Sequence, residues 1–164
     1  YIGILLDAFK MLKKERAGVK LMLIGPGLSE ETKIEDVKAC EYVSSLIKHI
    51  KACDVFITRP PVSAMESVAL GAPTIMIPIK GDVHQETIAR RLNDLGVLCH
   101  LRLQELTPQL LKDKIHFLLT NDEVRIKTAI MGKKLIDGLG GKRAAELIVN
   151  MIKQSPRSPE VGLE

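Results

Sequence analysis

The run from Cys53 to Leu92 limits most strongly what this chain can fold into. It reads CDVFITRPPVSAMESVALGAPTIMIPIKGDVHQETIARRL. Apolar runs at 54–58 and 73–78 predict two buried strands, and each is followed by a loop that opens into a helix, at 62–71 and 84–96. Loops at corresponding ends of neighbouring parallel strands are where open α/β sheets bind ligands. We therefore expect a ligand crevice here.

Strands and helices also alternate on both sides of this run. Further helices are predicted at 2–15, 44–53, 107–121, 121–139 and 141–153, and further strands at 19–25, 97–101 and, weakly, 40–43. This order predicts an α/β fold, a Rossmann-like and mostly parallel sheet flanked by helices. Such a domain normally begins with a strand and a glycine-rich turn. Because a helix comes first here, we expect the first strand to be missing from the chain.

Size and composition indicate one domain and exclude some partners. The chain has 164 residues with a net charge of +4, so we expect one domain over 1–153 and a disordered, proline-containing tail at 154–164 that ends in vector residues. No apolar stretch approaches the roughly 20 residues that cross a bilayer, and we expect a soluble, cytoplasmic protein. Two Tyr and three Phe are too few for single-stranded nucleic-acid binding. The positive charge weakly favours an anionic ligand or peripheral contact with an acidic membrane.

The two loops of the central run carry a small polar set: Arg59, Ser63, Glu66, His84 and Gln85. Ser63 has two interpretations, which the sequence leaves open. It is an ordinary N-cap that forms a capping box with Glu66, or it belongs to an anion site at a helix start while Glu66 binds a ribose diol. His84 and Gln85 open the next helix, and both side chains suit a hydroxyl-rich ligand. Asp82 is interpreted as a polar strand end.

These motifs resemble those of one enzyme family. The matching positions are Asp54, Thr58, Ser63, Glu66, Gly71, Pro73 and Pro78, followed by Gln85, Ala89 and Leu92. On this frame the chain resembles the C-terminal, donor-binding half of GT-B glycosyltransferases, especially the UDP-glycosyltransferases and the bacterial peptidoglycan GlcNAc transferases. The resemblance covers about positions 1 to 153, with its strong motifs between 53 and 96.

The resemblance implies a function and a set of roles. The domain would bind the UDP-sugar donor, UDP-GlcNAc or a similar one, of an enzyme that transfers the sugar to an unknown acceptor. Glu66 would bind the ribose hydroxyls, and Ser63 with neighbouring N–H groups the diphosphate. His84 and Gln85 would contact the donor sugar, and the backbone around Val43, at the end of the 40–43 strand, would contact the uracil edge. No metal or cofactor is implied, and no catalytic residue is assigned because the acceptor site and the base would lie in a missing N-terminal domain or partner subunit.

Three features depart from the family pattern. Pro60 and Pro61 replace glycines of the phosphate loop, the loop is one residue shorter, and Ile88 replaces a common Asn. Proline has no N–H donor, so we hypothesise that Arg59 supplies the lost positive charge. Two alternative functions stay open: a nucleotide-sugar 2-epimerase, and a partner subunit that binds the donor without catalysis.

Overall fold

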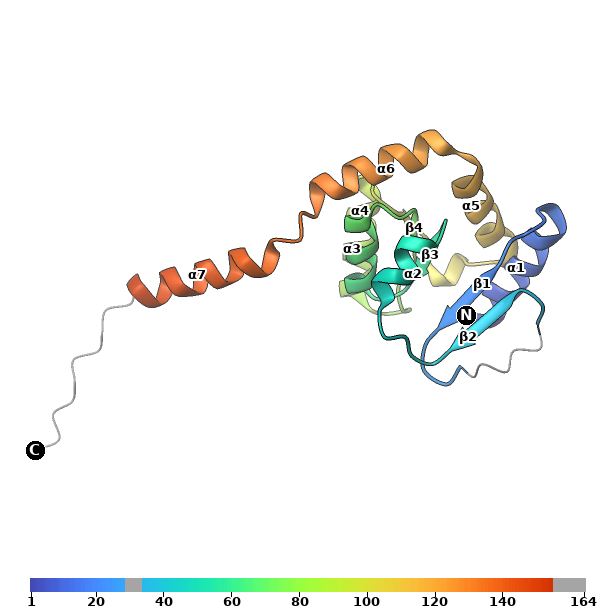
Figure 1. Ribbon diagram of the computed structural model, residues 1–164, viewed down its shortest axis with the longest axis horizontal. Helices are drawn as coiled ribbons and strands as arrows, with labels where there is room; N and C mark the ends of the chain where they lie inside the picture. Colours follow the sequence, from blue (N-terminus) through green and yellow to red (C-terminus); the bar gives the residue numbers. More distant parts are fainter. Residues whose placement is uncertain (29–33, 155–164) are drawn as a thin grey trace, which may run out of the picture.

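The computed structural model describes residues 1–28 and 34–154, and there helices and strands alternate along the chain as expected (Figure 1). The helices are α1 (Ile2–Glu15), α2 (Leu46–Ala52), α3 (Pro61–Leu70), α4 (Val83–Asp94), α5 (Pro108–Thr120), α6 (Asp122–Leu135) and α7 (Gly140–Gln154). The strands are β1 (Leu21–Ile24), β2 (Val37–Cys40), β3 (Phe56–Thr58), β4 (Thr74–Met76) and β5 (Cys99–His100), and a 3₁₀ turn follows at Leu103–Glu105. The α/β class is therefore confirmed.

The strands of the described part are all paired in parallel, but they form two sheets rather than the single sheet we expected. β1 pairs with β2, and the second sheet has the order β3-β4-β5. Parallel neighbours require a crossover between them. α2 lies in the connection that leads from one sheet to the other, while α3 and α4 connect the strands of the second. The crossovers of the second sheet thus contain the polar loops of the predicted site.

The second strand lies earlier in the chain than we expected. The weak strand predicted at 40–43 is instead β2, Val37–Cys40. Val37 and Ala39 are buried while Lys38 is exposed, which is the alternation of a strand with one face on the core. The residues that follow Cys40 include the exposed Glu41 and Tyr42, so they offer no second buried face.

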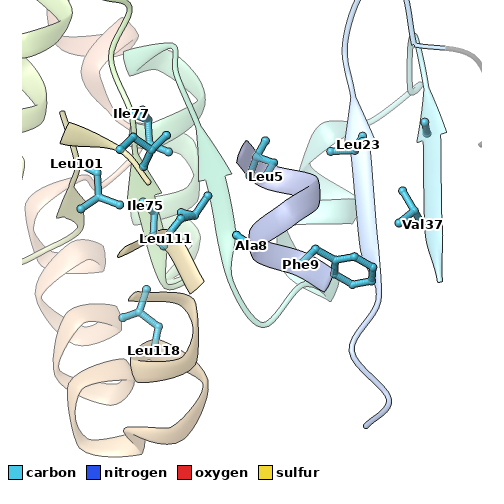
Figure 2. Packing of buried hydrophobic residues seen from close by; sticks show 12 residues of the cluster. Leu5, Ala8, Phe9, Leu23, Val37, Ile75, Ile77, Leu101, Leu111 and Leu118 are labelled. Atoms are coloured by element: carbon cyan, nitrogen blue, oxygen red, sulfur yellow. The ribbon is translucent and has the colours of Figure 1, made fainter. Parts of the chain in front are cut away.

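One core joins the two sheets, and α1 lies at its centre. Leu5, Ala8 and Phe9 of α1 belong to the same buried cluster as Leu23 of β1 and Ile75 of β4. Figure 2 shows the α1 side chains between the group from β1 and β2 and the group that includes Ile75 and Leu111. The spacing of these residues along α1 gives one apolar face, and burying that face fixes α1 against both sheets.

The end of α3 and its contact with α6 depend on two glycines. Gly71 ends α3 with a φ of 77°, the left-handed conformation expected from its position after the helix. Gly132 of α6 lies so close to α3 that a Cβ atom there would be 2.6 Å from the Val68 carbonyl oxygen. The backbones of the two helices therefore approach closely at Val68, a buried residue of α3.

The last helix, α7, stands apart from the rest of the described structure. It extends away from the body after a short connection (Figure 1), and all of its residues are exposed. The tail predicted from residue 154 lies outside the described residues except for Gln154, which ends α7. In the described part of the chain, no helix is long and apolar enough to span a membrane.

Candidate functional site

The register of the second sheet brings the two polar loops to the same edge. Thr58, the last residue of β3, is the partner of Met76, the last residue of β4. The ladder continues for one more bond, because the Ile77 N–H donates to the Thr58 carbonyl over 2.9 Å. The chain therefore leaves both strands side by side, and the starts of α3 and α4 follow from the same edge. This is the position at which parallel α/β sheets place their ligand sites.

The first of these loops is short because α3 begins earlier than we expected. Pro60 is the N-cap and Pro61 the first helical residue, so Ser63 lies in the first turn and is not the N-cap. Our N-cap and capping-box interpretation of Ser63 and Glu66 is thus wrong. The reason is that the fixed φ of proline suits the first helical position and its missing N–H costs nothing there.

The hydroxyl of Ser63 is engaged within the loop. Its Oγ lies 2.6 Å from the Thr58 Oγ1 and donates over 3.2 Å to the Pro60 carbonyl. Since a hydroxyl has one proton, Thr58 donates to Ser63 whenever Ser63 donates to Pro60. Thr58 is buried, so this pair ties the first turn of α3 to the end of β3. The sequence analysis did not identify Thr58 in this role.

Glu66 and Arg59 differ in how the fold surrounds them. Glu66 is exposed on α3 and has no ion-pair or hydrogen-bond partner among the described residues, whereas its neighbour Ser67 is fully buried. Arg59 is half-buried, and its guanidinium carbon lies 4.9 Å from the centre of the Tyr1 ring. A guanidinium thus lies directly before the N-cap of α3, and a free carboxylate lies in the second turn of the helix.

The second loop is organised by an aspartate that the sequence analysis set aside. Asp82 is the N-cap of α4, and its Oδ1 accepts from the Gln85 N–H over 2.9 Å. The Oε1 of Gln85 in turn accepts from the Ile79 N–H over 3.1 Å. The predicted sugar-contacting Gln85 therefore braces its own loop through its carbonyl end, while His84 is exposed beside it. The spacing Asp82-x-x-Gln85 is that of a capping box, a signal that could have identified Asp82.

A groove of about 390 Å³ lies beside this loop. Glu86 is in its wall, 3.6 Å from the Arg102 Nε and 3.2 Å from the His100 Nε2. The His100 side chain is 10% exposed, and its Nε2 has no hydrogen bond among the described residues. The His100 Nε2 and the Glu86 Oε1 are therefore close enough for an ion pair but are not aligned for a hydrogen bond. It attracts only when the imidazole carries a proton.

Val43 does not lie in a strand. It follows β2 by three residues, in the loop that leads to α2, and is half-buried. No described hydrogen bond links it to Ser63, Glu66, His84 or Gln85. Its placement by the carboxyl end of β2 is compatible with a role for the loop backbone, but the strand position we expected is wrong.

Neither sheet edge offers a metal centre in the part that the structure describes, where no group of three or more His, Cys, Asp or Glu side chains could hold an ion. The chemistry available at the edge is that of hydrogen bonds and single charges. It consists of helix-start N–H groups, one guanidinium, one free carboxylate, an imidazole and an amide. Such a set suits a polar organic ligand with an anionic part.

Comparison with known proteins decides the family. The sequence pattern of the "Glycosyltransferase family 28 C-terminal domain" matches residues 7–147, which is most of the chain. The chain belongs to this family. The resemblance noted from the motifs between 53 and 96 is thereby confirmed, and the α/β domain corresponds to the C-terminal half of GT-B glycosyltransferases.

Individual relatives of this family 28 domain are distant. The uncharacterized UDP-glucosyltransferase YojK of Bacillus subtilis (strain 168) is 28% identical over 110 residues, 66% of this chain and 27% of that protein. The NDP-glycosyltransferase YjiC of the same organism is 26% identical over 139 residues, 82% of this chain and 35% of YjiC. The chain thus spans about a third or less of the curated relatives that it matches.

Solved structures show the same fold. The Acinetobacter baumannii MurG structure matches with a TM-score of 0.67 and 16% identity, over 89% of this chain and 46% of MurG. The spinosyn forosaminyltransferase SpnP matches with a TM-score of 0.62 and 17% identity, over 85% of this chain and 38% of SpnP. At these identities the likeness concerns the fold alone.

Proposed function

We propose that this family 28 domain binds the nucleotide-sugar donor of a glycosyltransferase, and that the donor is a UDP-sugar such as UDP-GlcNAc. The observation that carries the proposal is the sheet edge where Thr58 and Met76 end neighbouring strands. There the starts of α3 and α4 present Ser63, Glu66, His84 and Gln85 within a family of sugar transferases. The names of the relatives YojK and YjiC, which specify UDP and NDP donors, support the nucleotide.

Glu66 is our candidate for the ribose. Its carboxylate is exposed and unpaired among the described residues, and an ionised carboxylate accepts hydrogen bonds only. A ribose offers two adjacent hydroxyl donors, which match that chemistry. Because Ser67 is buried against β4, α3 cannot rotate freely, and Glu66 is held on the outward face.

The first turn of α3 is our candidate for the diphosphate. Val62 and Ser63 keep backbone N–H groups without an acceptor in the described structure, and the helix dipole adds partial positive charge at this end. The helix is ten residues long in all. Arg59 adds a full positive charge directly before the turn. His84 and the amide nitrogen of Gln85 would then contact the donor sugar, and the loop at Val43 the uracil.

Transfer to an acceptor would need the remainder of a longer protein. The chain spans 27% of YojK and 35% of YjiC, and its family is described as a C-terminal domain. We therefore assign donor binding to this domain, and the acceptor site and catalytic base to an N-terminal domain or partner subunit. Closure of the two parts around the donor would exclude water and stabilise the departing diphosphate.

A calorimetric titration of the 164-residue chain tests the proposal. UDP and UDP-GlcNAc should bind, and Glu66→Gln should weaken both UDP and uridine by about tenfold or more, because a hydrogen bond to a charged group contributes about 1.5–3 kcal/mol. Glu123→Gln, an exposed carboxylate on α6, is the matched control and should bind as the unchanged chain does. Absence of binding to any nucleotide would sink the proposal. Product analysis with labelled UDP-sugar in the full-length protein separates transfer from 2-epimerisation.

A further inference from the structure

The contact between Tyr1 and Arg59 joins two segments that are far apart in the chain. Arg59 follows β3 and Tyr1 precedes α1, yet the guanidinium carbon lies 4.9 Å from the centre of the tyrosine ring. This distance is within the roughly 6 Å over which a ring face attracts a cation. The contact lies directly before the Pro60-Pro61 pair.

Tyr1 is anchored well enough to serve as a platform. Its carbonyl accepts the Leu5 N–H over 3.1 Å, and its ring packs against the core cluster that contains Leu5 and Phe9. Burial raises the pKa of the Tyr1 hydroxyl to about 12, although the nearby Arg59 charge acts in the opposite direction. The ring is therefore a neutral phenol at physiological pH, and its attraction to Arg59 is that of a ring face.

Arg59 keeps hydrogen-bonding capacity that the described protein does not use. Its Nε is buried without an acceptor, and no carboxylate of the described residues lies within ion-pair distance. Buried polar groups in native proteins nearly always have a partner, and none of the described residues supplies one to this Nε. A guanidinium has five N–H donors in a planar arrangement that suits phosphate and carboxylate oxygens.

The adjoining loop is poor in other donors. Pro60 and Pro61 have no N–H, and the Ser63 proton is taken by the Pro60 carbonyl or by Thr58. The N–H groups of Val62 and Ser63 remain at the helix start. The direction in which Arg59 points therefore decides how many donors this edge presents to an anion.

We propose that Tyr1 is a positioning residue whose ring holds the Arg59 guanidinium at the carboxyl end of β3, where its N–H groups receive the diphosphate of a nucleotide. The guanidinium thereby replaces the backbone donors lost at Pro60 and Pro61. The identity of the ligand as a nucleotide rests on the proposed function. The positioning of Arg59 for a diphosphate anion does not.

The test compares three ligands by calorimetry on the 164-residue chain: UDP, uridine and inorganic pyrophosphate. Tyr1→Leu keeps an apolar side chain in the core but removes the ring, and it should weaken UDP and pyrophosphate about five- to tenfold while leaving uridine unchanged. Tyr1→Phe keeps the ring and should stay within twofold for all three ligands. Arg59→Ala should weaken UDP and pyrophosphate at least as much as Tyr1→Leu. Adding Tyr1→Leu to Arg59→Ala should cause no further loss, because the ring acts only through Arg59.

A purely structural role of Tyr1 gives a different pattern. In that case Tyr1→Leu would weaken the binding of uridine and UDP alike, and the double variant would bind more weakly than Arg59→Ala alone. Either result overturns the inference. Phe117→Leu, a half-exposed aromatic in the last turn of α5, is the control and should change nothing. If the chain binds neither UDP nor uridine, the proposed function fails and the pyrophosphate titration alone tests the inference. Pyrophosphate binding that Tyr1→Leu weakens supports it. Absence of pyrophosphate binding, or binding that Tyr1→Leu leaves unchanged, overturns it.

Discussion

Two buried hydroxyls fix the rotation of α3 and so the direction of Glu66. The Ser67 Oγ lies 2.7 Å from the Thr74 Oγ1 of β4, and each hydroxyl also lies 2.8 Å from a backbone carbonyl oxygen, that of Ala64 and that of Ala72 respectively. Because each hydroxyl has one proton, one of the two donates to the other while the second donates to its carbonyl. Both residues are almost fully buried. Thr74→Val keeps the shape but removes the hydroxyl, so the free energy of unfolding should fall by about 1–2 kcal/mol in urea titration, as for other buried hydrogen bonds.

The matched control for this variant is Thr87→Val on α4. The Thr87 hydroxyl donates to the Val83 carbonyl over 2.7 Å but is exposed to water, so this change should stay within about 0.5 kcal/mol. Equal losses in the two variants would show that burial of the Ser67–Thr74 pair is not what matters.

Single residues could be predicted where their structure is decided locally. Gly71 ends α3, and Thr107 accepts from the Leu110 N–H as the N-cap of α5, both as the sequence indicated. The prediction that Ser63 is the N-cap of α3 was wrong because two local signals competed. Ser63 favours the N-cap position, but Pro61 favours the first helical position and the helix begins there. The contact of Tyr1 with Arg59 could not be predicted, since it depends on how α1 packs against the end of β3.

At the scale of elements, the start of α4 depends on a single cap. Asp82 accepts from the Gln85 N–H, and Gln85 accepts from Ile79. Asp82→Ala should therefore cost about 1 kcal/mol of unfolding free energy and release His84 and Gln85 from their position. If these two side chains contact the sugar as we propose, UDP-GlcNAc should bind the unchanged chain more tightly than UDP, and calorimetry should show that this difference is lost in the variant. Asp82→Asn keeps an N-cap oxygen and should retain most of both. Unchanged discrimination in Asp82→Ala would remove the α4 start from the sugar site.

The helices could be predicted more closely than the strands. Their apolar faces repeat over 7 to 15 residues, which gives periodicity room to show. The strands have only two to four residues. A short alternation of buried and exposed positions, such as that of Val37–Cys40, is hard to distinguish from the polar segment that precedes it. The division into two sheets follows from tertiary packing around α1, for which the sequence has no local signal.

At the scale of the molecule, α7 is the element that the rest of the described structure stabilises least. Leu147, Ile148, Met151 and Ile152 are each more than half exposed, at 58–71%. The helix is tied at its beginning, where Asp137 accepts from Arg143 over 2.7 Å and from the Leu139 N–H over 2.9 Å. The bond from Arg143 is the main cause that lowers the pKa of Asp137 from 3.8 to about 2.

The sign of that pKa shift fixes when the tie is present. Because the folded value lies below the unfolded one, the contribution is complete above about pH 4 and is lost as the pH falls through about 2. Both side chains are about half exposed, so salt screens the pair. At neutral pH the Asp137–Arg143 ion pair is present. Any unfolding of α7 at that pH is therefore due to the low stability of the helix and not to loss of this ion pair.

Limited proteolysis at neutral pH should therefore remove α7 first. An isolated helix of about 15 residues is marginal in water, so trypsin should cut at Lys142 and Arg143 within minutes, as mass spectrometry of the products would show. Lys112, 9% exposed and bonded to Glu15 of α1, provides the internal control and should stay uncut in the same digest. Resistance of α7 equal to that of α5 would contradict the prediction. It would mean that the apolar side of α7 is covered in solution, and gel filtration would then show association of the chain with itself.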